Sequence, residues 1–490
     1  MKKRIISWLK NNWILVLILL VGAFLRLYKI NEFMTFLGDE GRDVIVVRNL
    51  LVKADPILIG PGTSIGSMYL GPLYYYFIAP FLFLFNFSPV GPAVEIAFLG
   101  VITIFLIYKV SKEWFGETAS IFSSILYAIS PVVIIYSRSS WNPNIMPFFA
   151  LFSIYSIWKV WKEKKYNWLI VTVISYAFVL QSHYLGLLLA PVLFIFWLIS
   201  KVPVKYTLIA GSVFLFLMSP LFIFDIRHDW MNTKAFYKFL TVRQETVSIK
   251  PWKAIPNVYP IFVDINTSLL TGKNLLVGKI ITPLIILSLA WFIAVRKRIK
   301  QFNKPLLVLI IWLGFALLGL ALYKQHIYDH YFGFIFPALF ILLGFILQFV
   351  YKTKFKILAI LIFLILVFVN LKNSPILFSP NRQLQRSENV SKDIINKSLG
   401  EAFNFAVVAE RNYEDGYQYF LEKENSKMVE IDPQIPESVK AQLFVVCEME
   451  EKKCDPTHSS KAEVANFGWS KIDSMWEVDG VIIYKLIHTK

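Results

Sequence analysis

Apolar segments long enough to cross a lipid bilayer recur along most of this 490-residue chain, and they restrict its fold more than any other feature. A helix of about 20 apolar residues spans the hydrocarbon core, where the backbone must satisfy its own hydrogen bonds. Such segments lie at residues 13–28, 92–109, 118–136, 144–160, 167–182, 184–200, 206–224, 276–295, 305–323, 331–350 and 355–371. With 56% hydrophobic residues and a mean hydropathy of +0.57, the chain is too apolar for a soluble globular protein. The sequence therefore predicts an all-α polytopic membrane protein.

Basic residues gather in alternate short loops, at residues 2–10, 109–112, 159–165, 201–205, 296–304 and 352–356. The short loops between them hold little positive charge beyond Arg138 and Lys324. Because cytoplasmic loops carry the excess of Lys and Arg, the first set and the N-terminus are expected in the cytoplasm. The leading MKKR enters an apolar run without a cleavage site, so the first helix is expected to be retained. Membrane orientation thus explains the net charge of +17 without a nucleic-acid partner.

Residues 67–92 are apolar but are interrupted by glycine and proline. Their core, Leu73 to Phe85, is short for a span and suits a re-entrant or interfacial element. A full crossing here would also place every later basic loop on the wrong side of the membrane. We expect about eleven crossings within a range of 11–13, and whether residues 70–90 cross stays open.

The chain divides into two predicted domains at a change in composition. Residues 1–375 form the transmembrane domain, with external loops at 29–70 and 225–275, and residues 380–490 are polar enough to fold in water. Short β-rich runs at 405–409, 442–446 and 481–486, with a helical stretch at 414–424, predict a small α/β domain. The number of crossings places this domain outside the cytoplasm. Cys447 and Cys454 either form a disulfide there or remain free thiols.

An acidic cluster follows the first apolar segment. FLGDEGRDVIVVRN, residues 36–49, contains Asp39, Glu40, Arg42 and Asp43, and VIVVRNLLV predicts a helix lying on the membrane. Next, LIGPGTSIGSMYLGP, residues 58–72, has glycines that allow backbone N–H groups to approach a ligand. Tyrosines 69 and 74–76 either anchor in lipid headgroups or stack on sugars. An adjacent acidic pair is most often a solvated loop, but this combination indicates a site.

Further polar groups fall on the same predicted face. They are Arg138, Asn142 and Asn144 in YSRSSWNPN, His183 in SHY, Asp225 in FDIRHDW, and Lys324, His326, Asp329 and His330 in YKQHIYDHY. Each alone is more often an anchor at a helix end than a ligand contact. Together they predict an outward-facing ring of acids, cations and imidazoles. A helix over residues 232–245, with apolar and basic residues interleaved, is expected in the interface beside it.

The acidic pair in the first outer loop, the PLYYY segment and the YSRSxxxxN loop resemble features of the polytopic C-type glycosyltransferases. The resemblance is to bacterial relatives of protein O-mannosyltransferases and lipid A aminoarabinose transferases, and it covers roughly residues 10–350. It implies an enzyme that moves a sugar from a polyprenyl-phosphate donor to an acceptor glycan, lipid or protein. The reaction is expected at the outer face of the cytoplasmic membrane.

The resemblance also implies roles for individual residues. Asp39 is the expected general base, and Glu40 is its orienting partner or a metal ligand. The candidates for binding the donor phosphate are Arg42, Arg138, Lys324 and His330. The candidates for binding substrate are Asp43, Tyr74, Tyr75, Asn142, Asn144 and His183.

Relatives often have an acid where this chain has Asn142 and Asn144. An amide can coordinate a hard cation but cannot act as a base. A metal-independent reaction is therefore favoured, with a divalent metal ion as the other possibility.

Other functions predict different patterns. A transporter of lipid-linked sugars would place ionisable residues inside the spans, whereas here only Glu95 and Arg26 lie near their ends. A polysaccharide ligase or polymerase would work at the same face and would use a long second outer loop, which residues 225–275 offer. A non-catalytic assembly protein would be favoured if the Asp39 cluster proved dispensable.

Overall fold

The computed structural model describes residues 10–489 apart from 64–65, 242–245, 249 and 296–299. The predicted basic positions at 2–4 and 296–298, and the end of the predicted helix at 242–245, lie outside the described residues. Two compact units are present. The helical unit comprises Met1–Tyr28, Pro56–Phe81 and Gly91–Ser379, and the sheet unit comprises Lys29–Asp55, Leu82–Val90 and Pro380–Lys490.

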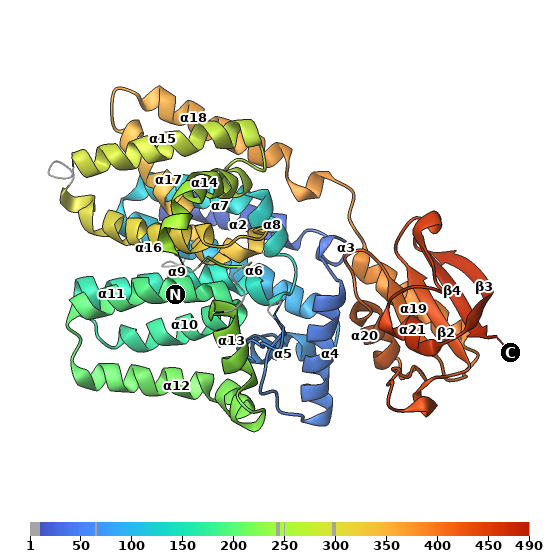
Figure 1. The fold of residues 1–490 in the computed structure, drawn as a ribbon. Helices are drawn as coiled ribbons and strands as arrows, with labels where there is room; N and C mark the ends of the chain where they lie inside the picture. The colour runs from blue at the N-terminus through green and yellow to red at the C-terminus, as the bar shows by residue number, and fades with distance from the viewer. Residues whose placement is uncertain (1–9, 64–65, 242–245, 249, 296–299, 490) are drawn as a thin grey trace. The chain divides into compact units, whose positions relative to one another are not determined.

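All predicted apolar segments of the helical unit are helical (Figure 1). The elements are α2 (Trp13–Leu27), α5 (Leu73–Leu84), α6 (Val90–Trp114), α7 (Glu117–Ile129), α8 (Pro131–Tyr136), η1 (Asn142–Ile145), α9 (Met146–Glu163), α10 (Trp168–Ser182), η2 (Tyr184–Leu189), α11 (Ala190–Ser200), α12 (Val204–Arg227), α13 (Met231–Thr241), η3 (Pro251–Ala254), α14 (Ile255–Leu270), α15 (Leu275–Ala294), η4 (Lys300–Phe302), α16 (Asn303–Ala321), η5 (Asp329–Ile335), α17 (Phe336–Tyr351), α18 (Lys356–Lys372) and η6 (Pro375–Leu377). Within the described chain, five stretches are both long and apolar enough to cross a membrane, and several shorter apolar helices accompany them. Multiple membrane crossings are thus confirmed.

Helix α14 lies within residues 225–275, for which the sequence predicted a long external loop with a helix over residues 232–245. It buries Ile265, Leu269 and Leu270 and packs against α15 and α16. Asn266 Nδ2 donates to Thr282 Oγ1 at 3.0 Å, which fastens α14 to α15. Helices α5 and α14 are two apolar helices beyond the eleven predicted segments, and whether residues 70–90 cross the membrane stays open.

The core of the helical unit surrounds α17, whose apolar stretch is almost entirely buried. Its polar residue Gln348 is fully satisfied there, because Nε2 donates to the Phe115 carbonyl at 2.6 Å and Oε1 accepts from the Ala119 N–H at 2.9 Å. Helices α9, α10, α11 and α12 lie side by side (Figure 1). The exposed surface of these helices is strongly apolar, as a lipid-facing surface must be.

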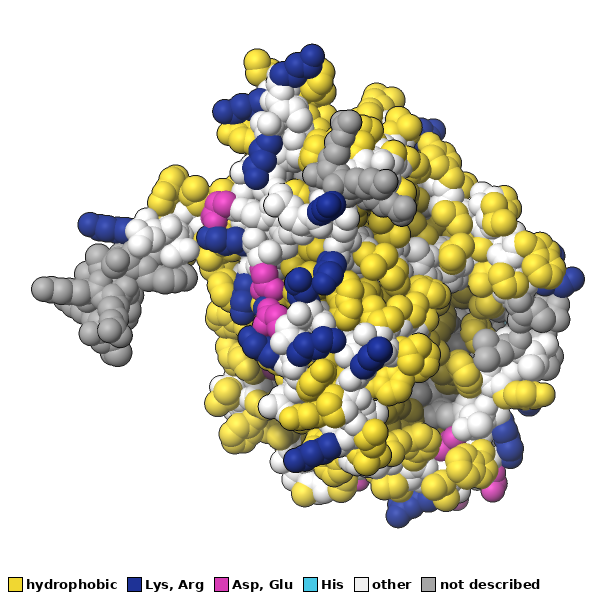
Figure 2. Space-filling view, turned by 90° about the vertical axis from the view of Figure 1, so that its left-hand side faces the viewer, with side chains coloured by type: hydrophobic (Ala, Val, Ile, Leu, Met, Phe, Trp, Pro, Cys, Tyr) yellow, Lys and Arg dark blue, Asp and Glu magenta, His cyan; other side chains and the backbone are white. Residues whose placement is uncertain are grey.

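Lysine and arginine gather at one end of the helical unit. Figure 2 shows the face on which α11 turns into α12 and α15 into α16, where basic side chains far outnumber acidic ones and lie among hydrophobic groups. This is the clustering that the loop charges predicted.

The sheet unit contains four strands in the order β1-β2-β4-β3. Strand β1 (Asn404–Val408) pairs in parallel with β2 (Gln442–Cys447), and β4 (Val481–His488) runs antiparallel to both β2 and β3 (Ser470–Val478). The remaining elements are α3 (Ile30–Phe33), α4 (Gly38–Lys53), α19 (Gln383–Lys397), α20 (Asp415–Lys423), η7 (Pro436–Ser438), η8 (Glu451–Lys453) and α21 (Ala462–Phe467). Helices α19 and α20 cover one face of the sheet, while α21 covers the other. The predicted α/β domain is confirmed, and β3 and α19 are additions to it.

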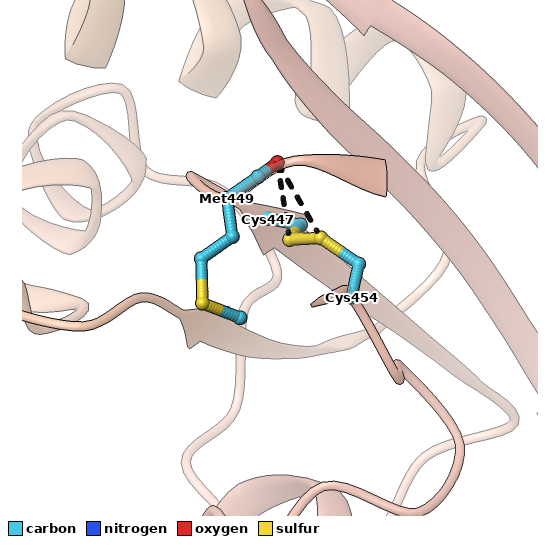
Figure 3. The surroundings of a disulfide bond; sticks show 3 residues. All are labelled: Cys447, Met449 and Cys454. Atoms are coloured by element: carbon cyan, nitrogen blue, oxygen red, sulfur yellow. Dashed lines mark hydrogen bonds between the residues drawn. A yellow bond between two sulfur atoms is a disulfide. The ribbon is translucent and has the colours of Figure 1, made fainter. Parts of the chain in front are cut away.

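Cys447 and Cys454 form a disulfide, which decides between the two predicted states. It joins the end of β2 to the residue after η8. The Met449 carbonyl oxygen lies 3.9 Å from the Cys447 sulfur and 3.7 Å from the Cys454 sulfur (Figure 3). The bridge therefore closes a short loop that contains Glu448.

Candidate active site

The acidic cluster occupies the first turns of a helix rather than a loop. Helix α4 begins at Gly38, ahead of the acids, and puts Asp39 and Glu40 in its first turn. Negative charge is favourable there because the helix dipole is positive at the N-terminus. The side chains consequently point in fixed directions, set by the helix and by what packs on it.

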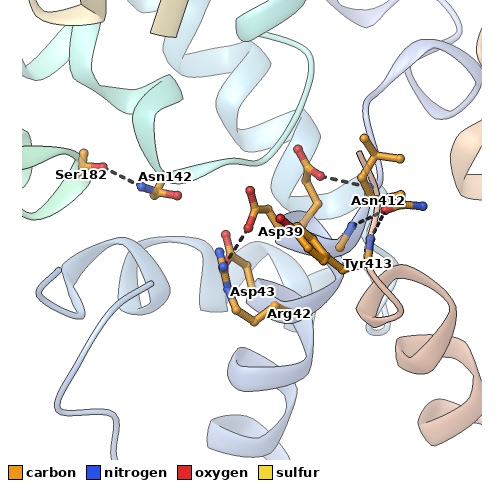
Figure 4. A network of polar contacts seen from close by, with 10 residues as sticks. Asp39, Arg42, Asp43, Asn142, Ser182, Asn412 and Tyr413 are labelled. Carbon is orange, nitrogen blue, oxygen red and sulfur yellow. Dashed lines mark hydrogen bonds and ion pairs between the residues drawn. The ribbon is translucent and has the colours of Figure 1, made fainter. Parts of the chain in front are cut away.

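The three carboxylates have different surroundings (Figure 4). The Asp39 side chain is 41% exposed, whereas Asp43 is 1% and Glu40 is 6% exposed. Glu40 Oε2 accepts from the Leu37 N–H at 3.0 Å, so this residue closes the first turn of its own helix. Burial raises the pKa of Glu40 to about 7. Glu40 thus has a capping contact, and its predicted orienting or metal-binding role stays a prediction. Asp39 is the accessible acid of the three.

Arg42 lies between the other two acids. Its Nη1 contacts Asp39 Oδ1 at 2.8 Å, while Nη2 and Nε contact Asp43 Oδ1 at 2.8 and 3.1 Å (Figure 4). A guanidinium shared in this way holds the Asp39 carboxylate at a fixed orientation. Its charge is also balanced by two carboxylates, so a phosphate would have to compete for it. Arg42 is better placed to position Asp39 than to bind the donor.

The sheet unit holds the start of α4 by hydrogen bonds. Asn412 Oδ1 accepts from the N–H groups of Gly38 and Tyr413, each at 2.9 Å (Figure 4). Asn412 Nδ2 donates to Glu448 Oε1 at 2.7 Å. The Tyr417 hydroxyl donates to the same Glu448 oxygen at 2.6 Å. Asn412 is 6% exposed, so this network is enclosed. The sequence did not predict it, because Asn412 follows Gly38 by 374 positions.

Close packing explains the two glycines of GDEGRD. A Cβ atom on Gly41 would lie 2.4 Å from backbone atoms of Asp415 and Gly416, and one on Gly38 would lie 2.6 Å from the Tyr413 Cβ. Helix α4 can therefore rest against the start of α20 only because both positions lack a side chain. The glycines serve helix packing.

The predicted polar loop of the helical unit is also well ordered by side-chain contacts. Arg138 is 2% exposed, and its Nη2 donates to the Tyr28 carbonyl at 2.9 Å. Burial lowers the pKa of Arg138 to about 10. Asn142 Nδ2 donates to the Ser182 carbonyl at 2.6 Å (Figure 4), and Asn144 Nδ2 donates to the Ser139 carbonyl at 2.8 Å. These contacts shape the loop; the ligand contacts predicted for the three residues stay predictions.

Two predicted histidines come together in the helical unit. The His183 and His330 rings lie 6.0 Å apart, and His330 packs on Trp141 at 4.4 Å. His183 Nδ1 accepts from the Leu185 N–H at 3.2 Å. Burial lowers the pKa of His183 to about 3, so this imidazole is neutral near pH 7 and can hydrogen-bond but not bind as a cation.

The tyrosines after the outer loop differ in exposure. Tyr74 and Tyr75 are 1% and 2% exposed, and the Tyr74 hydroxyl hydrogen-bonds Ser140 Oγ at 2.7 Å. Tyr76 is 40% exposed, and its hydroxyl bonds both the N–H and the carbonyl of Ile57 at 3.0 Å. The first two pack in the core, so the substrate contact predicted for them is not visible here and stays a prediction.

The glycines of residues 58–72 have a packing role as well. A Cβ on Gly60 would lie 2.2 Å from the Gly71 carbonyl oxygen, and one on Gly71 would lie 2.1 Å from Gln181 Oε1. The Gly60 N–H donates to the Leu70 carbonyl at 2.7 Å. Close packing therefore accounts for Gly60 and Gly71, and the ligand contact predicted for this segment stays a prediction.

A cavity of about 960 Å³ in the helical unit collects charged groups. Lys324, predicted as a phosphate-binding residue, lines it together with His326, and the sequence missed Lys273 and Asp264 in the same wall. Lys273 Nζ pairs with Asp329 Oδ2 at 2.9 Å. The cavity is large enough for a polar head group.

Asp225, one of the polar groups predicted on the outer face, accepts hydrogen bonds from the residues that begin α13. Its Oδ1 accepts from the Asn232 N–H at 2.7 Å, and its Oδ2 accepts from the Thr233 hydroxyl at 2.6 Å. It is 4% exposed and fixes the turn that leads into α13. Among the described residues, no three His, Cys, Asp or Glu side chains are grouped so as to hold a metal ion.

The fold is that of known membrane proteins with a C-type glycosyltransferase architecture, as the sequence predicted. ArnT from Cupriavidus metallidurans bound to undecaprenyl phosphate aligns with a TM-score of 0.64 at 12% identity, over 97% of this chain and 98% of that one. The archaeal oligosaccharyltransferase AglB from Archaeoglobus fulgidus, in complex with an inhibitory peptide and a dolichol-phosphate, aligns with a TM-score of 0.55 at 12% identity. That alignment covers 89% of this chain and 70% of AglB.

The sequence gives a second, independent likeness. Residues 70–224 match the family described as dolichyl-phosphate-mannose-protein mannosyltransferase. No curated protein matches the chain. The family match and the fold confirm the resemblance stated from the motifs, and they agree with the predicted class of enzyme, a membrane glycosyltransferase.

Proposed function

We propose that this protein transfers a sugar from a polyprenyl-phosphate donor to an acceptor hydroxyl, with Asp39 as the general base. One observation carries the proposal: of the three carboxylates at the start of α4, only Asp39 is substantially exposed, and Arg42 fixes its orientation. The family match and the ligands bound to the two structural relatives, undecaprenyl phosphate and dolichol-phosphate, support the donor class.

The chemical step needs one proton acceptor and a stabilised leaving group. Arg42 binds Asp39 Oδ1, so we assign proton uptake to Oδ2. As Oδ2 takes the proton, the acceptor oxygen bonds to the anomeric carbon. The bond from that carbon to the phosphate oxygen breaks, and polyprenyl phosphate leaves with the electron pair.

The leaving phosphate requires cations rather than a second acid. Lys324 is exposed in the charged cavity and is the strongest candidate among the predicted phosphate ligands. His330 lies among aromatic rings and Arg138 is buried. The proposed reaction uses no metal ion, and a divalent ion is the alternative.

The proposed orientation of the protein in the membrane rests on the positions of its basic residues. We infer that the basic end of the helical unit faces the cytoplasm of a cell whose cytoplasmic membrane holds the protein, and that the sheet unit lies outside. The basic face in Figure 2 supports the first part. The Cys447–Cys454 disulfide supports the second, because structural disulfides persist in oxidising compartments.

The test is transfer of a radiolabelled sugar from polyprenyl-phosphate donors in purified membranes, by wild type and Asp39→Asn. Loss of transfer with normal expression and intact donor binding is the expected result. Asp55→Asn is the matched control, since Asp55 is an exposed acid just beyond the other end of α4. Unchanged transfer by Asp39→Asn would remove it from the chemical step. No transfer by wild type with any donor would favour a polysaccharide ligase or an assembly protein.

A further inference from the structure

The sheet unit has a polar cavity of about 600 Å³ that the proposed chemistry does not use. Apart from Pro380, each residue that lines it has a planar amide, carboxylate or guanidinium group. Five come from residues 381–389 around the start of α19, Glu32 comes from α3, and Asp479 comes from the turn between β3 and β4. This lining is mostly polar and offers an apolar lipid chain little to contact.

Hydrogen bonds that each involve at least one backbone atom connect the walls of this cavity. The Arg382 N–H donates to the Glu32 carbonyl at 2.9 Å, and the Phe36 N–H donates to Gln383 Oε1 at 3.0 Å. Arg386 Nε donates to the Asp479 carbonyl at 3.3 Å. These bonds hold three segments in place around the cavity: α3, the start of α19 and the β3–β4 turn. The cavity is therefore preformed.

Several polar groups in the cavity have capacity left for a ligand. Gln385 Oε1 and Glu32 Oε2 are enclosed atoms with no hydrogen-bond donor among the described residues. The Arg382 guanidinium approaches Glu32 Oε2 only to 3.7 Å, and the Arg382 side chain is 68% exposed. Asn389 Nδ2 donates to Asp479 Oδ2 at 2.7 Å, which leaves the Asn389 carbonyl oxygen for another contact.

The balance of charge decides the ligand class. Two arginines face two carboxylates in the lining, so the cavity is not the strongly cationic site that a phosphate group selects. Oxygen atoms that lack a hydrogen-bond donor lie beside guanidinium and amide N–H groups. Hydroxyl groups suit this mixture because they both donate and accept hydrogen bonds. The volume also lies within the range of small-ligand sites.

We propose that this cavity binds the hydroxyl groups of a neutral glycan, as an acceptor subsite. The identity of that glycan as acceptor rests on the proposed function, whereas its binding does not. Glu32 in α3 lines the cavity, and the same segment continues into α4, which carries Asp39. An acceptor held here is bound by the unit that supplies the base.

The experiment measures sugar binding without any donor. Full-length protein in detergent is titrated by calorimetry and saturation-transfer NMR with neutral di- and tetrasaccharides of glucose, mannose and galactose, and with inorganic phosphate. The variant is Gln385→Ala with Asn389→Ala. The control is Asn396→Ala, an exposed asparagine on the same helix α19 and outside the lining.

Saturable binding of at least one oligosaccharide is expected, weakened about tenfold or more in the double variant, since a lost hydrogen bond is worth roughly 1 kcal/mol. Asn396→Ala and Asp39→Asn should bind as wild type does, so a failure of this site is distinguishable from a failure of the catalytic proposal. Where transfer is measurable, the double variant should raise KM for the acceptor and leave kcat unchanged. No binding of any oligosaccharide, binding of phosphate alone, or equal binding by the double variant would overturn the proposal.

Discussion

Replacing Asn412 with alanine tests whether the sheet unit positions the catalytic helix. Asn412 Oδ1 is the acceptor for the Gly38 N–H at 2.9 Å, and its Nδ2 donates to Glu448 at 2.7 Å. The substitution leaves the buried Gly38 N–H without that acceptor, which costs roughly 1–3 kcal/mol. Loss of a hydrogen bond to a carboxylate adds roughly 1.5–3 kcal/mol. The two terms share one residue and need not add, so we expect about 3 kcal/mol.

The effect should appear first as local opening at the start of α4. A cost of about 3 kcal/mol corresponds to roughly a hundredfold faster hydrogen exchange where exchange proceeds through that opening. Exchange of the peptide covering residues 36–45 is measured by mass spectrometry on the full-length protein. Transfer activity should fall through kcat, with donor affinity kept, because Asp39 lies next to Gly38.

Two comparisons separate positioning from general damage. Glu448→Gln keeps an acceptor oxygen for Asn412 and Tyr417, so its exchange at residues 36–45 should lie close to wild type. Asn396→Ala should leave both exchange and activity unaltered. If Asn412→Ala exchanges at the wild-type rate over residues 36–45, the hydrogen bond does not hold the helix and this reasoning is wrong.

Three further outcomes follow from the sheet unit. Gly41→Ala should destabilise it by about 1–3 kcal/mol in thermal unfolding because the new Cβ meets backbone at 2.4 Å, whereas Gly211→Ala, with nothing within 4 Å, should not. Burial raises the pKa of Glu40 from 4.5 to about 7, so the folded state holds a proton that the unfolded state releases. Stability should therefore fall as pH rises from about 4.5 to 7. In Glu40→Gln, the melting temperature should change less over this pH range. Cys454→Ser should lower stability by about 2–3 kcal/mol and make melting insensitive to reductant, whereas wild type stays sensitive.

Much of the helical unit could be predicted because the length of an apolar run is a local property. Helix α14 was missed for the same reason: Pro256, Pro260 and Asp264 interrupt its apolar pattern, and packing on α15 and α16 makes it a helix nonetheless. In the sheet unit, β1 and β2 are buried on both faces and read as continuous apolar runs. Strand β3 is mostly exposed, so it had no such signal.

The site was predictable to the level of residue type and no further. Adjacent acids look equivalent in sequence, but a helix that starts at Gly38 puts Glu40 where its side chain returns to the Leu37 N–H, and leaves Asp39 outside. That distinction depends on where the helix begins. The partners of the helix start, Asn412 and Glu448, depend on tertiary contacts that no local pattern encodes.

The sheet unit keeps Asp39 in a fixed orientation. A general base must keep its orientation to within small angles, and a residue on a supported helix does so better than one on a loop. Helix α4 alone has no side chain that satisfies the Gly38 N–H; Asn412 supplies the acceptor, and the glycines let α20 pack at backbone distance. Support of this kind can come only from a folded unit, because an isolated asparagine would have to be ordered at its own entropic cost. Residues 380–490 of the sheet unit are therefore part of the machinery that presents Asp39. Removal of these residues should abolish transfer even where α4 is kept and the helical unit remains inserted.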